Sequence, residues 1–313
     1  MTHVMGRLTL IVNARAGRGR ARENLLPLRR ALDERGLDHD VVETAGAGSA
    51  GEVARAALEA GSRYLVAVGG DGTVHEIVNG MFRRSEDEAG YQAVSDRAIL
   101  GVAAMGSGCD FIRTFGLDRK PDILARHFAS ETIMPVDVGV VTYARPDGGP
   151  GERLFVNVGE AGYGAEVVRK AARYPRWFGR FRYLLGAYGA IRSMRRPDTT
   201  VHLAHADVER PVVALIAANA QYFGGGMKVA PRALPDDGKF NVQIFSGQRS
   251  QVFLMTQQLY RGEHLPHPQI SEYQSPTVSL DPPVPLAVEA DGELLGTTPA
   301  TFRLLPKALR LKI

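Results

Sequence analysis

The sequence predicts an α/β plus β architecture, with an N-terminal Rossmann-like α/β domain followed by a C-terminal β-sandwich domain. Up to about residue 130, short apolar runs alternate with segments whose apolar residues recur at helical spacing. Beyond residue 135, short strand-like runs follow one another between Pro and Gly clusters. Because 313 residues suffice for two hydrophobic cores, we place the domains at residues 1–135 and 136–313.

In the first domain, strands and helices are expected to alternate. Apolar runs predict strands at residues 8–13, 40–44, 64–68 and 99–103. Helical spacing predicts helices at residues 18–35, 51–60 and 73–82, with another from about residue 110. This order is typical of a parallel sheet with crossover helices, whose binding loops gather at the carboxyl ends of the strands.

In the second domain, short strands dominate. They are predicted at residues 136–143, 154–158, 199–204, 212–218, 240–245, 277–280, 286–289 and 302–305. Turn-forming residues separate them, and few helical segments interrupt them. This pattern favours a β-sandwich.

Composition excludes several classes of protein. With 44% hydrophobic and 23% charged residues, the chain is typical of a soluble globular protein. A net charge of +4 is too small to demand a nucleic-acid partner, and we expect none. The single cysteine, Cys109, excludes an internal disulfide and a cysteine metal site. Without a leader or an apolar run of about 20 residues, we expect a cytoplasmic protein that touches a membrane only peripherally.

The strongest local signal is Gly69-Gly70-Asp71-Gly72-Thr73, which follows a predicted strand and precedes a predicted helix. Glycines let backbone N–H groups close around phosphate oxygens, and a helix N-terminus favours an anion. Asp71 would orient magnesium or a hydroxyl group there. The plain alternative is a turn with Thr73 as a helix cap. Two further glycine-rich loops, residues 13–19 and 105–110, also follow predicted strands, so three loops should meet at one sheet edge and bind phosphate.

One glycine pattern is misleading. Residues 46–51 match the dinucleotide motif GxGxxG, with Asp71 20 residues beyond, which would suit a dehydrogenase. That motif belongs to the first strand–helix turn, whereas this one follows the second predicted strand. We therefore interpret residues 46–51 as a connecting loop with the start of a helix. The chain also lacks a Walker-type phosphate loop.

At residues 69–80, GGDGTVHEIVNG resembles the signature of the diacylglycerol kinase catalytic-domain family, which includes soluble bacterial lipid kinases and the sphingosine and ceramide kinases. Further segments resemble the family's motifs in the same order, at residues 13–21, 106–116, 155–167, 224–242, 262–268 and 288–293. The resemblance spans nearly the whole chain. It departs from the family pattern at Ala14, where proline is usual, and at Ser107 and Cys109, where threonine and asparagine are usual.

The resemblance implies an ATP- and Mg²⁺-dependent kinase that transfers the γ-phosphate to a hydroxyl of a diacylglycerol-like or sphingoid lipid, with the active cleft between the domains. It implies that Asp291 or Glu293 is the general base, with Asp291 slightly preferred, and that Asp71 also belongs to the catalytic groups. The residues implied to hold ATP are Asn13, Gly17, Thr44, Gly69, Gly70, Asp71, Gly72, Thr73, Glu76, Gly106 and Ser107.

Two of these assignments have plain alternatives. By itself, Asp291-Gly292 is a hairpin turn, and only the resemblance makes it catalytic. Residues 234–239 resemble a family loop that holds a structural magnesium through the Asp237 side chain and the carbonyls of Leu234 and Lys239. A simple type I turn explains the same residues nearly as well.

Residues 169–196, from Arg169 to Arg196, hold nine basic residues and no acidic one. The aromatic and leucine residues interleaved with them are Trp177, Phe178, Phe181, Tyr183, Leu184, Leu185 and Tyr188. Such a segment can contact an anionic membrane, where a lipid substrate would lie. The alternatives are a partly buried helical hairpin with a solvated basic face and, more weakly, a nucleic-acid patch.

Two other functions stay open at this point. An NAD kinase shares a GGDGT-like loop and a two-domain plan, although the basic aromatic segment and the Asp-Gly-Glu motif favour a lipid. A non-catalytic nucleotide or lipid sensor would keep the fold, but retention of both Asp71 and Asp291 argues against it. The acceptor lipid and the oligomeric state, including a homodimer, are left open by the sequence.

Overall fold

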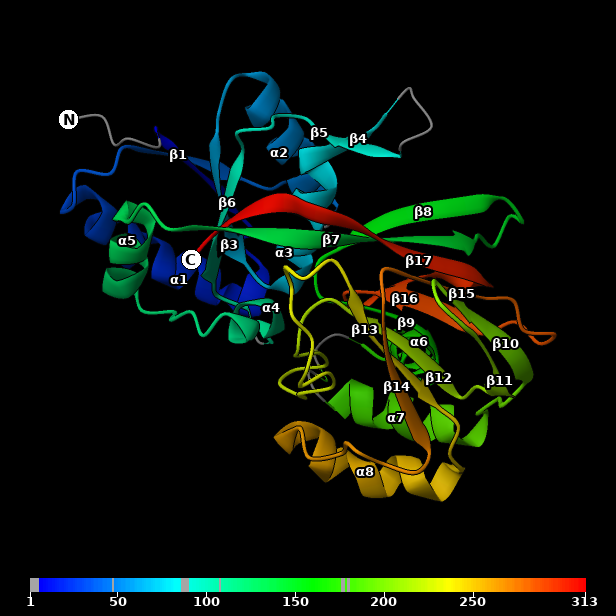
Figure 1. Ribbon diagram of the computed structural model, residues 1–313. Helices are drawn as coiled ribbons and strands as arrows, with labels where there is room; N and C mark the ends of the chain where they lie inside the picture. The colour runs from blue at the N-terminus through cyan, green and yellow to red at the C-terminus, as the bar shows by residue number, and fades with distance from the viewer. Residues whose placement is uncertain (1–5, 47, 86–89, 107, 176–177, 179–180) are drawn as a thin grey trace. The chain divides into compact units, whose positions relative to one another are not determined.

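The computed structural model describes residues 6–46, 48–85, 90–106, 108–175, 178 and 181–313 (Figure 1). The chain folds into two compact units: unit 1 comprises Met1–Asp137 with Leu305–Ile313, and unit 2 comprises Val138–Leu304. The first boundary lies two residues beyond the predicted one, and the chain's last nine residues return to unit 1. These residues belong to unit 1 because Leu311 pairs with Leu100 of a unit 1 strand. No pattern in the neighbouring sequence predicts this pairing.

Unit 1 is built on a parallel sheet. Its strands run in the order β6, β3, β1, β2, with bounds Ile99–Ala104, Tyr64–Gly69, Leu8–Val12 and His39–Glu43. Registers such as Leu8 opposite Tyr64 confirm that these strands are parallel. The predicted alternation of strands and helices is therefore confirmed. A short antiparallel pair, β4 (Phe82–Arg84) and β5 (Tyr91–Ala93), was not predicted.

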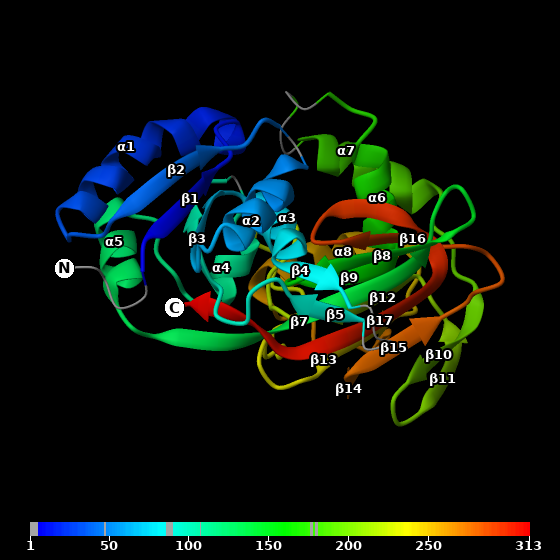
Figure 2. The same ribbon diagram turned by 90° about the horizontal axis from the view of Figure 1, so that it is seen from above.

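Helices cover both faces of this sheet (Figure 2). One face carries α1 (Arg20–Asp33) and α5 (Pro121–Ala129), whose apolar residues share a core with β1 and β3. The other face carries α2 (Ser49–Glu59) and α3 (Asp71–Met81). These two helices touch through backbone, since a Cβ at Gly80 would collide with the Gly51 carbonyl oxygen. Gly51 is thus a packing residue in the first turn of α2, which begins at Ser49, so the helix start predicted in this segment is confirmed.

The smaller helices of unit 1 flank its loops. They are η1 (Ala16–Gly19), a short 3-10 helix after β1, and α4 (Asp110–Thr114), which follows β6. Because both begin at the carboxyl end of a strand, they help to shape that edge of the sheet.

Unit 2 is a β-sandwich. Most of its strands are those predicted, with bounds β8 Pro150–Phe155, β9 Val158–Gly162, β10 Asp198–Leu203, β11 Asp207–Pro211, β12 Ala214–Ala218, β13 Phe240–Phe245, β14 Ile270–Ser275, β15 Thr277–Leu280 and β16 Ala287–Ala290. The long strands β7 (Ile133–Ala144) and β17 (Glu293–Lys312) each begin or end in unit 1.

Strand β17 pairs with both groups of strands that make up the sandwich. Near its start it pairs with β16, which continues the antiparallel order β9, β12, β13, β14. Further along it pairs with β15, which pairs with β10 and then β11. The aromatic core lies among these strands: the Phe155 ring stacks on Phe240 at 5.7 Å and meets Phe302 edge-on at 6.3 Å.

One predicted strand is interrupted. Residues 154–158 were expected to be continuous, but β8 ends at Phe155 and β9 begins at Val158. The N–H groups of Val156, Asn157 and Val158 bind the Asp291 carboxylate instead of a neighbouring strand. The strand is therefore interrupted where its backbone N–H groups bind the Asp291 side chain.

Within the described residues, unit 2 also contains the helices α6 (Tyr163–Ala171), α7 (Phe181–Arg192) and α8 (Arg249–Arg261). Helix α6 follows β9 and packs against α7 (Figure 1). Among the described residues, none of the helices combines the length and the hydropathy that crossing a membrane would require.

Candidate active site

The three glycine-rich loops of unit 1 meet at one edge of the parallel sheet, as predicted. The N–H groups of Met105 and Gly106 donate to the Gly69 carbonyl oxygen at 2.7 and 3.0 Å. A Cβ at Gly106 would lie 2.5 Å from the Gly70 Cα, so backbone packs directly on backbone there. Gly17 has a φ of 62°, and a Cβ on it would collide with the Met105 carbonyl oxygen. Side chains at these positions would separate the loops.

Helix α3 starts at this edge of the sheet, beside the glycine-rich loops. Helix α3 begins at Asp71 with Gly70 as its N-cap, so Thr73 is not the cap that the plain turn reading required. The first-turn N–H groups of a helix have no partners within that helix, and its dipole favours negative charge. The Asn13 side-chain amide donates to the Thr73 hydroxyl at 3.2 Å, which ties the first loop to this turn.

Asp71 links the second loop to the third. Its Oδ1 accepts the backbone N–H of Phe111, the second residue of α4, at 3.2 Å. The carboxylate therefore lies between the starts of two helices, α3 and α4. This position fits the predicted role of orienting a cation or hydroxyl beside a bound phosphate.

Thr44 and Glu76 lie at the edges of this site. Thr44 follows β2, and its N–H donates to the Val12 carbonyl oxygen at 2.9 Å, next to the first loop. The Glu76 carboxylate accepts the N–H groups of Gly48 at 2.8 Å and Ala50 at 3.0 Å. Glu76 thus caps the start of α2. Its predicted contact with ATP stays a prediction, and Ser107 lies outside the described residues.

Cys109 occupies an unusual backbone conformation in the third loop. Its φ is 56°, in the left-handed region where asparagine is one of the few favoured side chains besides glycine. The thiol is buried and donates to the Gly106 carbonyl oxygen at 3.3 Å. Burial raises the pKa of the thiol to about 11, so it is neutral at physiological pH.

In unit 2, Asp291, Gly292 and Glu293 form the turn that we call the acid turn. Asp291 and Gly292 have φ values of 51° and 86° and connect β16 to β17, so the hairpin interpretation is confirmed. The Asp291 carboxylate accepts the N–H groups of Val156, Asn157 and Val158 at 3.0, 2.9 and 3.1 Å. These bonds fasten the acid turn to the β8–β9 connection.

Glu293 has a different environment. It forms an ion pair with Arg153 of β8 at 3.2 Å, and 37% of its side chain is exposed. A substrate hydroxyl can therefore approach this carboxylate from solvent. Asp291 and Glu293 are both partly exposed, but Asp291 binds three backbone N–H groups whereas Glu293 pairs with one arginine. Which of the two accepts a proton stays a prediction, in which Asp291 was slightly preferred.

Two acids that the sequence analysis did not select lie beneath the acid turn. Glu160 on β9 and Glu289 on β16 are directly opposite in the strand register, and both are buried. Glu160 accepts the Gly164 N–H at 2.5 Å, and Glu289 Oε2 accepts the Gly292 N–H at 2.7 Å. Burial raises the pKa of Glu160 to about 7, and burial together with Glu160 holds the pKa of Glu289 well above its usual range. For Glu289 the available signal was an acidic residue inside the predicted strand 286–289, whereas Glu160 lies beyond the predicted strand 154–158.

The candidate magnesium loop is an exposed turn. The Asp237 carboxylate accepts the Lys239 N–H at 3.0 Å, and Leu234, Asp237 and Lys239 are all exposed. Its donors would be oxygen atoms, which suits a largely hydrated Mg²⁺ ion. No group of three or more His, Cys, Asp or Glu side chains that could hold a metal occurs within the described part of the chain.

Family models match both parts of the chain. The diacylglycerol kinase catalytic domain matches residues 7–141, and the YegS C-terminal NAD kinase beta sandwich-like domain matches residues 157–313. The chain is 31% identical, over 83% of its length and 78% of the relative, to the protein described as "Probable lipid kinase YegS-like" of Chromohalobacter salexigens.

The chain belongs to the family of diacylglycerol kinases and YegS-like lipid kinases. This is a family of phosphotransferases, so the predicted family and enzyme class are confirmed. The chain is also similar to the diacylglycerol kinase of Bacillus subtilis, with 24% identity over 95% of this chain and 93% of that one. It is 27% identical to the diacylglycerol kinase of Mycobacterium tuberculosis, over 99% and 96% of the two chains.

Solved structures confirm the fold of this lipid kinase family member. A diacylglycerol kinase structure from Bacillus anthracis aligns with a TM-score of 0.68 and 21% identity, covering 98% of this chain and 96% of that one. A second structure from the same organism aligns with a TM-score of 0.74 and 22% identity, covering 98% and 94%. The N-terminal α/β domain and C-terminal β-sandwich are therefore as predicted.

Proposed function

We propose that this protein is an ATP- and Mg²⁺-dependent lipid kinase whose acceptor is the hydroxyl of a diacylglycerol-like or sphingoid lipid. The observation that carries this proposal is the meeting of three glycine-rich loops around the start of α3, in a chain of the lipid kinase family. The loops would bind the triphosphate through backbone N–H groups, with Thr44 and Glu76 nearer the nucleoside.

Phosphoryl transfer depends mainly on positioning and on stabilisation of charge. Glu293 would accept the proton of the acceptor hydroxyl as its oxygen attacks the γ-phosphorus atom. The bond between that phosphorus and its bridging oxygen breaks, and ADP leaves with the bonding electrons. Asp291 would hold the acid turn in place through its three hydrogen bonds.

Magnesium, when bound with the nucleotide, would offset the triphosphate charge, and Asp71 is the carboxylate beside the glycine-rich loops that would hold it. A structural magnesium would use the Asp237 side chain and the carbonyls of Leu234 and Lys239. The Asp237 carboxylate and the carbonyls are hard oxygen donors on an exposed turn, which supports that assignment.

The test is a substrate panel with purified protein, ATP and Mg²⁺. Diacylglycerol, monoacylglycerol, sphingosine and ceramide are presented in mixed micelles, and NAD in solution, with products identified by mass spectrometry. We expect a phosphorylated lipid from at least one micelle and no NADP. Phosphorylation of NAD alone would replace this proposal with the NAD kinase alternative. ATP binding without any transfer would favour the non-catalytic sensor.

A further inference from the structure

Helix α7 packs its small residues inward, against α6. Gly186 and Ala190 are buried, and a Cβ at Gly186 would lie 2.7 Å from the Val167 carbonyl oxygen of α6. The Tyr163 hydroxyl of α6 donates to the Ala187 carbonyl oxygen at 3.4 Å. Because this face has almost no side-chain volume, the large residues of α7 are on the other side.

The outer face of α7 is apolar. Phe181, Leu184 and Tyr188 are 69%, 64% and 65% exposed, and Leu185 lies among them at helical spacing. Phe178, Phe181, Leu184 and Leu185 line a hollow of about 490 Å³. Among the described residues, thirteen large hydrophobic side chains are exposed, and six of them lie between Tyr174 and Tyr188. Such concentration is typical of a surface that binds a partner.

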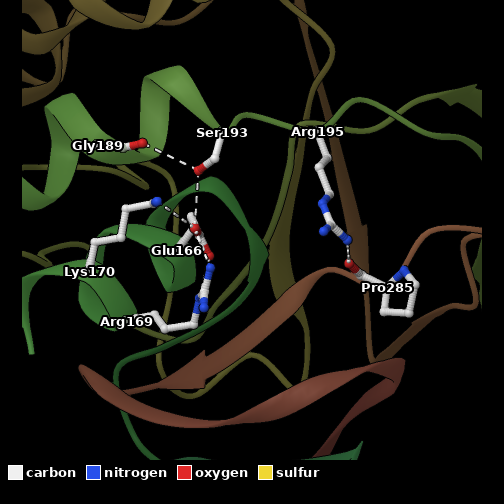
Figure 3. A network of polar contacts seen from close by, with 7 residues as sticks. All are labelled: Glu166, Arg169, Lys170, Gly189, Ser193, Arg195 and Pro285. Carbon is white, nitrogen blue, oxygen red and sulfur yellow. Dashed lines mark hydrogen bonds and ion pairs between the residues drawn. The ribbon is translucent and has the colours of Figure 1, made fainter. Parts of the chain in front are cut away.

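Part of the basic charge near this face is neutralised. The Glu166 carboxylate binds Arg169 at 2.6 Å and Lys170 at 3.4 Å, and it accepts the Ser193 hydroxyl at 3.2 Å (Figure 3). Arg195 donates to the Pro285 carbonyl oxygen at 3.1 Å in the same view. Arg169 and Lys170 share one carboxylate, which offsets one of their two charges, whereas Arg195 keeps its charge and binds a neutral carbonyl oxygen of unit 2.

Three other arginines retain their charge beside the apolar face. Arg173 and Arg192 are exposed, and Arg182 lies over the Tyr183 ring at 4.7 Å. Arg192 follows Phe181, Leu185 and Tyr188 at helical spacing. None of the three arginines forms an ion pair with an acid in the described portion of the chain. Trp177, Arg176 and Arg180, which the sequence analysis also included, lie outside the described residues.

We propose that the outer face of α7 is a docking surface for an anionic lipid bilayer, which deepens the proposed function by naming where the acceptor is met. Apolar side chains of an interfacial helix enter the headgroup region, while arginines beside them attract anionic lipid by about 1 kcal/mol each. A second copy of the chain is a poorer occupant, because a two-fold contact would bring identical arginines together.

The test measures binding to vesicles without nucleotide. Vesicles of phosphatidylcholine alone and of phosphatidylcholine with phosphatidylglycerol are titrated, and the emission of the single tryptophan, Trp177, and co-sedimentation are recorded. We expect binding at least about tenfold tighter to the anionic vesicles. The Phe181→Ser/Leu184→Ser variant should bind at least about tenfold more weakly, and Arg182→Gln and Arg192→Gln about fivefold more weakly each.

The matched control is Leu26→Ser, which removes an exposed leucine of α1 that is 55% exposed. It should bind vesicles like the unmodified protein, and circular dichroism should show all variants folded. Equal binding to both vesicle types, or unchanged binding of Phe181→Ser/Leu184→Ser, would overturn the docking surface. So would a dimer that these substitutions dissociate while vesicles stay unbound. Phosphorylation of a short-chain acceptor in solution tests the kinase proposal separately.

Discussion

Each unit has a cluster of backbone N–H groups beside a glycine-rich loop or turn, but the two clusters differ in whether a side chain of the protein binds them. In unit 1 the first turn of α3 faces the glycine-rich loops, and the nearby carboxylate of Asp71 bonds to α4 instead. In unit 2 the N–H groups of residues 156–158 are already bound by the protein's own Asp291. The comparison separates an arrangement that fastens the fold, around Asp291, from one where we propose that a phosphate binds, at the start of α3.

The largest stability effect should come from Asp291→Ala. It leaves three backbone N–H groups without their acceptor, so the free energy of unfolding should fall by about 3 kcal/mol or more. Denaturant titration measures this. Glu293→Ala is the matched control, because its surface ion pair should contribute about 1 kcal/mol or less. Equal losses for both variants would contradict the assignment of Asp291 as the fastening residue.

The buried acids beneath the acid turn predict a pH dependence of stability. The folded pKa of Glu160 is raised from 4.5 to about 7, so folding favours its protonated form. This favourable contribution is complete below about pH 4.5 and is lost as the pH rises through about 7, at a cost of about 3 kcal/mol. Glu289 shifts in the same direction.

The variant Glu160→Gln should therefore be more stable than the unmodified protein at about pH 8, with little difference at about pH 4.5. Thermal unfolding across this range measures the effect. Glu209→Gln, which changes an exposed acid of β11, is the control and should leave the pH profile unchanged. A stability difference that is the same at both pH values would contradict a titrating buried pair.

Much of the unit 1 site could be predicted from the sequence, whereas much of the unit 2 site could not. Glycines at the ends of apolar runs mark places where backbones approach closely, and Gly106 shows such an approach. The pairing of Glu160 with Glu289 depends on the register between β9 and β16, which are distant in sequence. Tertiary contacts also decide two other features. Residues 156–158 bind Asp291, and Leu311 pairs with β6, and both contacts join segments that are far apart in sequence.

Gly106→Ala tests whether the close contact between the second and third glycine-rich loops shapes the unit 1 site. A Cβ there would lie 2.5 Å from the Gly70 Cα, so the second and third loops must separate. We expect a loss of about 1–3 kcal/mol in unfolding free energy and weaker ATP binding, measured by denaturation and calorimetry. Gly46→Ala is the control, because its Cβ would meet nothing within 4 Å. Unchanged ATP affinity in Gly106→Ala would show that the loop contact does not shape the site.

The smallest effect concerns Cys109. Since its thiol is buried and its pKa is raised to about 11, a thiol reagent should react far more slowly with the folded protein than with the denatured protein. The reaction rate with and without denaturant measures this difference. A fast reaction of the native thiol would mean that the third loop opens readily in solution.

The most direct test of the account compares turnover and stability in Glu293→Gln and Asp291→Asn, assayed with the acceptor that the substrate panel identifies. Glu293→Gln should keep its melting temperature and lose about a hundredfold to ten-thousandfold in kcat, whereas Asp291→Asn should mainly lose stability. Full activity in Glu293→Gln, together with a stable but inactive Asp291→Asn, would contradict it and make Asp291 the base.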